Sequence, residues 1–451
     1  MQIKVKPVLI VGRGWHVFPQ PDGQLEVTMD AETSRSKVES LHREVTERLR
    51  ADVAFSEPAL VQEEADLAEL RTGACDADAL LVYISGGMHH GPLERLVWDL
   101  EIPTIAFSGE YTPMMGLYAL PAEVREHYPN VTFALDSKEI DQQLRLLGVR
   151  KKLRNTKVVL LGRHQRETSP WQHIPDPDVV RRNLGVEFIP VSSSQFLKEV
   201  GEIEEAKAEA LAQQWMANAK GVAEPSQVEV KEAAKTYLAL DNLLKTMQAQ
   251  AVSVNCLELM YQYHRDPPCF VLALLRDDGF PAGCEADASA TLTMVILEYI
   301  ADRPAYMGNV VRADPENNLV MISHGCSPSR VAGRDLPPKP YKLVHSHSCI
   351  PFTRTLDGGA GVTSYVDYLD KGQEVTIARM GVNLDRMLAV RGEIVDCRDT
   401  ICDRTTLTLR VNDAREFFHK ATGNHHVVVY GNYTMELSGL CEMLSIRLVA
   451  P

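Results

Sequence analysis

Two short apolar runs, each closed by a glycine, constrain the fold of this chain more than any other feature. Residues 5–12 read VKPVLIVG and residues 157–162 read KVVLLG. After the first run, helix-like and strand-like stretches alternate, at 36–50, 78–85, 91–100 and 103–107. This strand–helix–strand rhythm predicts an open, mostly parallel α/β sheet. The second run restarts the rhythm, so we expect a second α/β domain after about residue 155.

The alternation of predicted strands and helices in the second unit ends near Pro337–Pro340. Before this break we expect strands at 186–191 and 251–256 and helices at 203–219 and 228–248. After it come short β-type runs without long helices, at 374–380, 386–390, 405–411 and 426–430. Such runs are typical of an antiparallel barrel or sandwich. We therefore predict two open parallel-sheet (Rossmann-like) α/β domains, residues 1–155 and 156–335, followed by a β-rich, barrel-like domain, residues 336–451.

Charge and composition argue against several classes of protein. A net charge of −14 does not supply the basic face that nucleic-acid binding needs. No run of about 18 apolar residues predicts a membrane span, and the first residues lack a signal-peptide pattern, which favours the cytoplasm. Nine cysteines without C-x-x-C spacing predict reduced thiols rather than a disulfide framework or a zinc site. Gly12-x-Gly14 lacks the third glycine of a dinucleotide fingerprint, which argues against nicotinamide binding.

The stretch from Gly283 to Ser329 holds the best candidate for a functional site. It contains the acidic pair Glu285 and Asp287, a polar Asn309 in an apolar segment, and His324 at the close of a strand-like run. Residues 288–300 predict a helix whose N-terminus would stabilise the two carboxylates beside a cation. The same pair is also explained as a helix cap.

A pair of histidines near the C-terminus is a second candidate. His425 and His426 follow a turn signal and open a predicted strand. Because side chains alternate along a strand, the two would point to opposite faces, and at most one would enter a given site. A purely structural, hydrogen-bonding role for the pair is the alternative.

Other polar residues are candidates for substrate contacts because of where they stand. Ligands gather at the carboxyl ends of parallel strands, where we expect His89, His90, Glu110 and Glu258. Arg330 could bind an anionic group with two hydrogen bonds. His345 and His347, in one strand-like segment, are further candidates. An exposed or internally satisfied side chain is an equal alternative for Arg330, His345 and His347. For Glu258 a surface carboxylate is at least as good an explanation.

The order of these motifs resembles the L-fucose isomerase and L-arabinose isomerase superfamily. From about Asn255 to the C-terminus, the sequence shows C-E-x-D at 284–287, S-H with C-S-P at 323–328, and G-N-H at 423–425. The resemblance implies an aldose–ketose isomerase that acts on a pentose, deoxyhexose or related sugar. It also implies a divalent metal, Mn²⁺ before Mg²⁺ or Co²⁺, and a homotrimer or homohexamer with active sites between subunits.

Carried over by position, the resemblance implies roles for individual residues. Glu285 would bind metal and move a proton, and His324 and His425 would be ligands, with His426 in reserve. Asn309 departs from the pattern, since it stands where the family has a second acidic ligand. An amide offers an oxygen but no charge, and it cannot act as a base.

This departure leaves the reaction type open. Asp287 or Asp314 could supply the missing carboxylate. Otherwise Asn309 would serve as a weak ligand or as a hydrogen-bonding contact to the substrate. The alternatives to isomerisation are an epimerase or retro-aldol lyase working through the same enediolate, and a noncatalytic sugar-binding protein.

Overall fold

A computed structural model describes most of the chain: residues 2–11, 16–19, 22–28, 31–85, 91–108, 127–164, 174–346, 361–368, 370–400 and 403–450. Two compact units emerge, Met1–Lys151 and Lys152–Pro451, and each is described by itself. Four predicted contact residues lie outside the described ranges: His89, His90, Glu110 and His347. Within those ranges, no helix is both long and apolar enough to cross a membrane.

The first unit is built on a parallel sheet with the strand order β4-β1-β6-β7-β8, and β5 also pairs with β1. The sheet strands are β1 (Ile3–Val11), β4 (Val53–Phe55), β5 (Ala59–Val61), β6 (Ala79–Ser85), β7 (Thr104–Phe107) and β8 (Val131–Ala134). The other elements are the hairpin β2 (His16–Pro19) and β3 (Leu25–Thr28), the short η1 (Glu64–Asp66), and the helices α1 (Ala31–Arg48), α2 (Leu67–Gly73), α3 (Gly91–Trp98) and α6 (Ser137–Arg154). Strands with both faces covered bury nearly all their residues, as β1 and β7 do.

The second unit begins with another parallel sheet, in the order β10-β9-β12-β13. Its strands are β9 (Lys157–Leu161), β10 (Glu187–Val191), β12 (Ala251–Val254) and β13 (Ala282–Gly283). Its helices are α7 (Pro177–Leu184), α8 (Ser193–Gly201), α9 (Glu205–Asn218), α10 (Gln227–Met247), α11 (Cys256–Tyr261) and α12 (Cys269–Asp277). A small sheet follows, made of β11 (Gly221–Val222), β16 (Tyr341–His345) and β17 (Val362–Val366). The predicted restart of the α/β rhythm is thus confirmed.

Six antiparallel strands then close into a barrel in the order β18-β21-β14-β15-β20-β19, because β18 also pairs with β19. The barrel strands are β14 (Tyr306–Asp314), β15 (Leu319–His324), β18 (Glu374–Met380), β19 (Arg386–Asp399), β20 (Thr405–Val411) and β21 (His425–Tyr430). Strand β22 (Arg447–Val449) adds to β19, and the helices are α14 (Ala414–Lys420) and α15 (Thr434–Met443). The predicted barrel-like region is confirmed. Two of its strands, β14 and β15, precede Pro337–Pro340 in the sequence.

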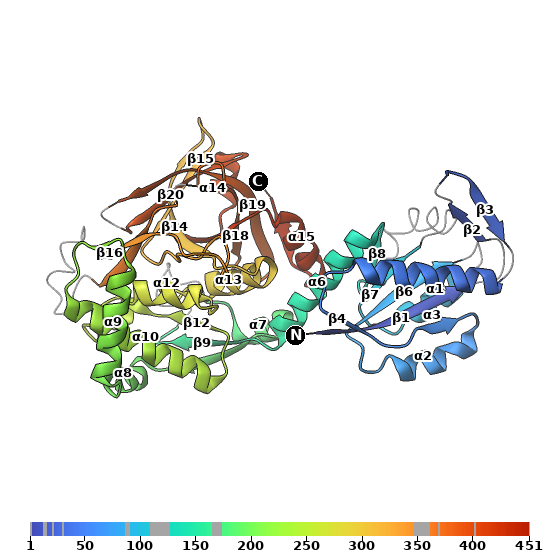
Figure 1. The fold of residues 1–451 in the computed structure, drawn as a ribbon, viewed down its shortest axis with the longest axis horizontal. Helices are drawn as coiled ribbons and strands as arrows, with labels where there is room; N and C mark the ends of the chain where they lie inside the picture. Colours follow the sequence, from blue (N-terminus) through green and yellow to red (C-terminus); the bar gives the residue numbers. More distant parts are fainter. Residues whose placement is uncertain are drawn as a thin grey trace. The chain divides into compact units, whose positions relative to one another are not determined.

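Helix α13 (Ala288–Ala301) joins the second sheet to the barrel. It contacts β12 and β13 on one side and β18 and β21 on the other. Figure 1 shows α13 between β12 and β18. A helix apolar on all sides is expected at such a buried position. Gly283 precedes it, and a Cβ there would lie 1.9 Å from Thr291 Oγ1, so only glycine lets β13 pass so close to α13. Ser289 Oγ, in the first turn of α13, donates to Met380 O of β18 (2.7 Å), so the N-terminus of α13 faces the barrel.

Candidate active site

Glu285 lies in a strained turn between β13 and α13. Its φ is 56° and that of Ala286 is 54°, a left-handed conformation that costs a residue with a side chain about 1–3 kcal/mol. Backbone hydrogen bonds hold the turn, from Ala286 N–H to Val254 O (2.9 Å) and from Asp287 N–H to Cys284 O (3.1 Å). The turn presents the Glu285 carboxylate, whose side chain keeps 23% of its exposure, to the barrel.

Asp287 is fully buried, and both of its carboxylate oxygens have partners. Oδ1 accepts a hydrogen bond from Ala290 N–H (2.9 Å) and so caps α13. Oδ2 accepts one from Arg379 Nη1 (2.8 Å) and lies 3.0 Å from His425 Nδ1. Burial alone would raise the pKa of Asp287, but the Arg379 and His425 side chains outweigh burial and hold this pKa below its usual range. Asp287 is therefore an anion that orients His425.

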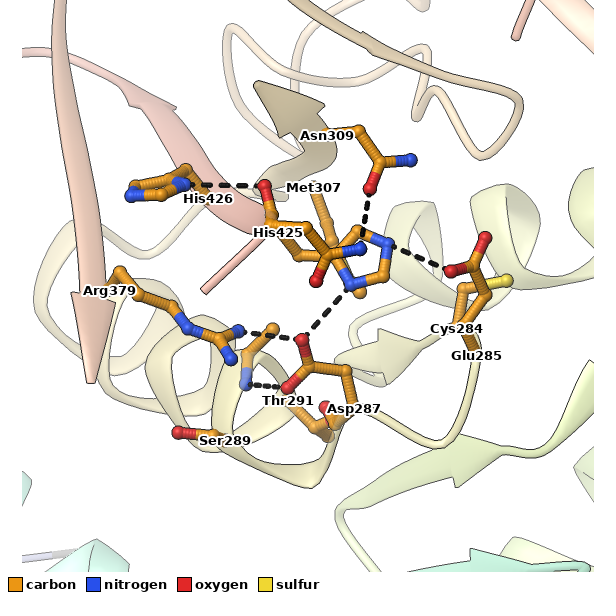
Figure 2. A network of polar contacts seen from close by, with 12 residues as sticks. Cys284, Glu285, Asp287, Ser289, Thr291, Met307, Asn309, Arg379, His425 and His426 are labelled. Carbon is orange, nitrogen blue, oxygen red and sulfur yellow. Dashed lines mark hydrogen bonds and ion pairs between the residues drawn. The ribbon is translucent and has the colours of Figure 1, made fainter. Parts of the chain in front are cut away.

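His425 opens β21 and points toward both carboxylates, as Figure 2 shows. An ionised Asp287 can only accept, so we assign the ring proton to Nδ1, which leaves a lone pair on Nε2. Nε2 is buried, has no hydrogen-bond partner in the described part of the chain, and lies 3.5 Å from Glu285 Oε2. Proteins prepare metal-binding histidines in this way, with a carboxylate fixing the nitrogen that does not bind the metal.

His324 completes a group of three at the end of β15. Its Nε2 lies 3.8 Å from Glu285 Oε1, and its ring centroid lies 5.3 Å from that of His425. Glu285, His324 and His425 each offer one ligand atom, and these atoms lie within 4.8 Å of one another. One carboxylate and two imidazoles suit a divalent first-row ion such as Mn²⁺, Fe²⁺ or Co²⁺. The residues present thus fit the metal that the sequence suggests.

His426 lies on the other face of β21. Its ring packs on Phe417 at 5.2 Å between centroids, and its Nδ1–H donates to Asn424 O (3.4 Å). Burial, together with the charge of Arg379, lowers the pKa of His426 to about 3. The His426 ring is thus buried against Phe417, a residue of the barrel core, and faces away from Glu285 (Figure 2).

Asn309 lies directly opposite His425 in the β14–β21 pairing. Its Oδ1 accepts a hydrogen bond from Asn424 Nδ2 (2.8 Å), and the residue is partly exposed. Asn309 therefore lies at the edge of the site next to His425 (Figure 2). Asp314, at the far end of β14, binds its own turn through Asn317 Nδ2 (2.9 Å).

The remaining predicted residues have partners outside the group of three. Glu258 Oε2 accepts from the backbone N–H of Arg163 at the end of β9. Arg330 Nη1 donates to Arg334 O and Leu336 O, both at 2.9 Å, in its own loop. His345 Nε2 lies 3.0 Å from Glu229 Oε1 on α10.

Two residues near the site, Arg379 and His164, were not found from the sequence. Arg379 stands in β18, and its only signal was a lone cation in an apolar strand, EVTIARM. A Cβ on Gly423 would lie 2.8 Å from Arg379 Nη2, so the turn before His425 needs glycine. His164 follows the glycine that ends β9, with Nδ1 3.1 Å from Gly162 O and Nε2 3.0 Å from Ser253 Oγ.

Comparison with known proteins gives distant relatives of one kind. No protein-family profile matches the chain. It is 22% identical over 376 residues to the sulfoquinovose isomerases of Priestia aryabhattai and Priestia megaterium, which covers 78% of this chain and 78% of each relative. A sulfoquinovose isomerase of a Clostridium species is 24% identical over 221 residues, or 47% of this chain and 46% of the relative. An ABC transporter solute-binding protein structure from Burkholderia multivorans aligns at a TM-score of 0.16 and 12% identity, too weak a likeness to carry an argument. Similarity over most of the chain to sulfoquinovose isomerases supports a sugar isomerase.

Proposed function

We propose that this chain is a metal-dependent aldose–ketose isomerase whose active site is built on Glu285, His324 and His425. One observation carries the proposal. A partly exposed carboxylate stands against two buried imidazoles, and one imidazole is fixed by the Asp287–Arg379 ion pair. The similarity to sugar isomerases over 78% of the chain supports the reaction class.

The reaction moves a proton between C1 and C2 of a sugar, next to a carbonyl group. A divalent cation held by Glu285, His324 and His425 would stabilise the negative charge that develops on the sugar oxygens. Glu285 has two carboxylate oxygens and is exposed enough to take the proton from one carbon and return it to the other. Asp287 keeps the lone pair of His425 directed at the site, and Asn309 offers an amide to a sugar hydroxyl.

The relatives' name suggests which sugars to test first. Sulfoquinovose, a pentose and a deoxyhexose differ in the group carried at the far end of the sugar, whereas the C1–C2 chemistry is shared. We therefore propose a panel that begins with sulfoquinovose and includes L-fucose, L-arabinose and D-arabinose.

The test is solvent-proton exchange with the purified full chain. In D₂O with Mn²⁺, we expect deuterium to enter C2 of an aldose or C1 of its ketose, together with ketose formation, and we expect chelation to stop both. NMR of the sugars measures the two. Deuterium with an epimer in place of a ketose would assign the related enediolate reaction. If no sugar exchanges with Mn²⁺, Mg²⁺ or Co²⁺, the enzyme proposal fails, and sugar binding that survives chelation would identify a noncatalytic binder.

A further inference from the structure

Four buried cysteines meet next to Glu285, although they are far apart in the sequence. Cys256 opens α11, Cys269 opens α12, Cys284 follows β13 and Cys326 follows β15. Each is 3% exposed or less. We call these four residues the thiol cluster. Their convergence was not predicted, because no two of them have the short spacing of a metal-binding motif.

The sulfur atoms of the thiol cluster are close together. Cys256 Sγ lies 3.4 Å from Cys284 Sγ, and the ligand atoms of Cys284, Cys326 and His324 lie within 4.8 Å of one another. Hydrogen bonds to the other three thiols, together with burial, hold the pKa of Cys284 well above its ordinary value. A tetrahedral ion with metal–sulfur bonds of about 2.3 Å holds its sulfurs about 3.8 Å apart. The cluster therefore has nearly the spacing of such a site.

A buried cation beside the thiol cluster favours negative charge there. Arg276 is 0% exposed, and its hydrogen bonds go to neutral acceptors: Ala282 O, Cys326 O and Met307 Sδ. Glu298, a carboxyl group on α13 whose charge also acts on Arg276, is bound by Arg334. A buried guanidinium without an anion is costly. Three thiolates around a divalent ion carry a net charge of −1, which Arg276 would balance.

His324 connects the thiol cluster to the candidate active site. Its Nδ1 accepts a long hydrogen bond from the backbone N–H of Cys326 (3.3 Å). This contact leaves the ring proton on Nε2, which faces Glu285 Oε1 at 3.8 Å. In this tautomer the lone pair of His324 is on Nδ1, next to Cys326. Binding an ion together with Glu285 requires the other tautomer.

We infer that Cys284, Cys326 and His324, together with a third thiol of the cluster, form a second metal site, for a thiophilic ion such as Zn²⁺ or Cd²⁺. Because His324 belongs to both groups, an ion at the thiol site and an ion at Glu285 exclude each other. The thiol site itself stands on the geometry of the cluster. Only the mutual exclusion rests on the proposed isomerase function.

The test uses metal-free, full-length protein in which the exposed Cys75 is replaced by serine. Titration with Cd²⁺ is expected to produce the ultraviolet thiolate-to-cadmium absorption, saturating at one equivalent. Cys284→Ser and Cys326→Ser should each lose this absorption. Cys441→Ser, which removes a buried thiol in α15 that contacts Met387, should retain it. Circular dichroism checks that each variant is folded.

Two results would overturn the thiol site. One is the absence of thiolate absorption with Cd²⁺ in protein whose four cluster cysteines are intact. This result does not depend on whether any cluster variant folds. The other is an absorption that persists in folded Cys284→Ser and Cys326→Ser. Either would leave the four thiols as small packing groups.

A second measurement separates the thiol site from the proposed function. If both hold, one equivalent of Cd²⁺ should abolish turnover supported by Mn²⁺, and excess Mn²⁺ should restore it. A protein with the Cd²⁺ absorption but no turnover of any sugar would keep the thiol site and refute the isomerase. Full turnover in the presence of bound Cd²⁺ would refute the exclusion.

Discussion

Two imidazoles of the second unit, His425 and His164, differ in their hydrogen-bond partners. His425 lies 3.0 Å from the Asp287 carboxylate and 3.5 Å from that of Glu285. His164, at the end of β9, bonds to Gly162 O and Ser253 Oγ in the described part of the chain, and burial lowers its pKa to about 4. The difference shows what prepares a histidine for chemistry. A carboxylate that accepts from one ring nitrogen directs the lone pair of the other nitrogen toward the site. Neutral hydrogen-bond partners on both nitrogens instead give the ring a structural role.

The largest expected effect comes from removing the partly exposed carboxylate of Glu285, next to His425. Glu285→Gln keeps the shape of the side chain but removes both the base and a charged ligand. We expect turnover to fall by about 10²–10⁴-fold, the usual contribution of a general base, and Mn²⁺ affinity to fall with it. Ketose formation and calorimetric Mn²⁺ titration measure the two. The matched control is Glu316→Gln in the exposed turn after β14, and unchanged turnover in Glu285→Gln would remove that residue from its assigned role.

The next effect concerns the buried anion. Arg379→Met removes the cation that pairs with Asp287, both fully buried, and should destabilise the protein by about 3–5 kcal/mol. Arg391→Met is the control, because Arg391 also lies on a barrel strand but is 64% exposed and pairs with Glu374. An exposed pair of this kind is worth about 0–1 kcal/mol. Urea denaturation of both variants measures the contrast, and equal losses would contradict the proposed role of burial.

A smaller effect tests how the surroundings of His164 lower its pKa. Its pKa is lowered to about 4 in the folded protein, against about 6.5 in an unfolded chain. The unfolded state therefore binds more protons between these values, so the free energy of unfolding should rise with pH from about 4 to 6.5, by at most about 3 kcal/mol. His164→Gln should flatten this rise in urea denaturation at several pH values. The exposed His419→Gln should leave it unchanged, and an equally steep rise in His164→Gln would refute the assignment.

The sequence predicts the fold class because its signals are local. The glycine-ended strands β1 and β9 and the barrel strands β18 and β20 have periodicities that a single stretch reveals. The site depends on pairings between distant segments. Asn309 faces His425 only because β14 pairs with β21, and β14 precedes the prolines at which the predicted alternation of strands and helices ends. The order of the motifs nevertheless indicated both residues, through a family resemblance.

Buried partners were harder to predict than the candidate ligands. Arg379 and the thiol cluster carry no spacing signal, since their neighbours come from other elements. Their roles follow from burial, which is a property of the folded chain. A cation inside an apolar strand such as β18 is a signal that could have been used, because a buried arginine requires an anion or several acceptors.

The smallest expected effect comes from adding a negative charge at Asn309, the position where the family resemblance expects an acidic residue. Asn309→Asp keeps the oxygen that accepts from Asn424 Nδ2 and adds a negative charge on the strand position opposite His425. If a cation binds between Glu285, His324 and His425, its affinity should rise by about tenfold, or about 1.4 kcal/mol. Asn318→Asp adds the same charge in the turn before β15 and should leave Mn²⁺ affinity unchanged in calorimetric titration. An Asn309→Asp variant that binds Mn²⁺ no more tightly would place the cation away from β14, and the missing acid would then be no handicap to this site.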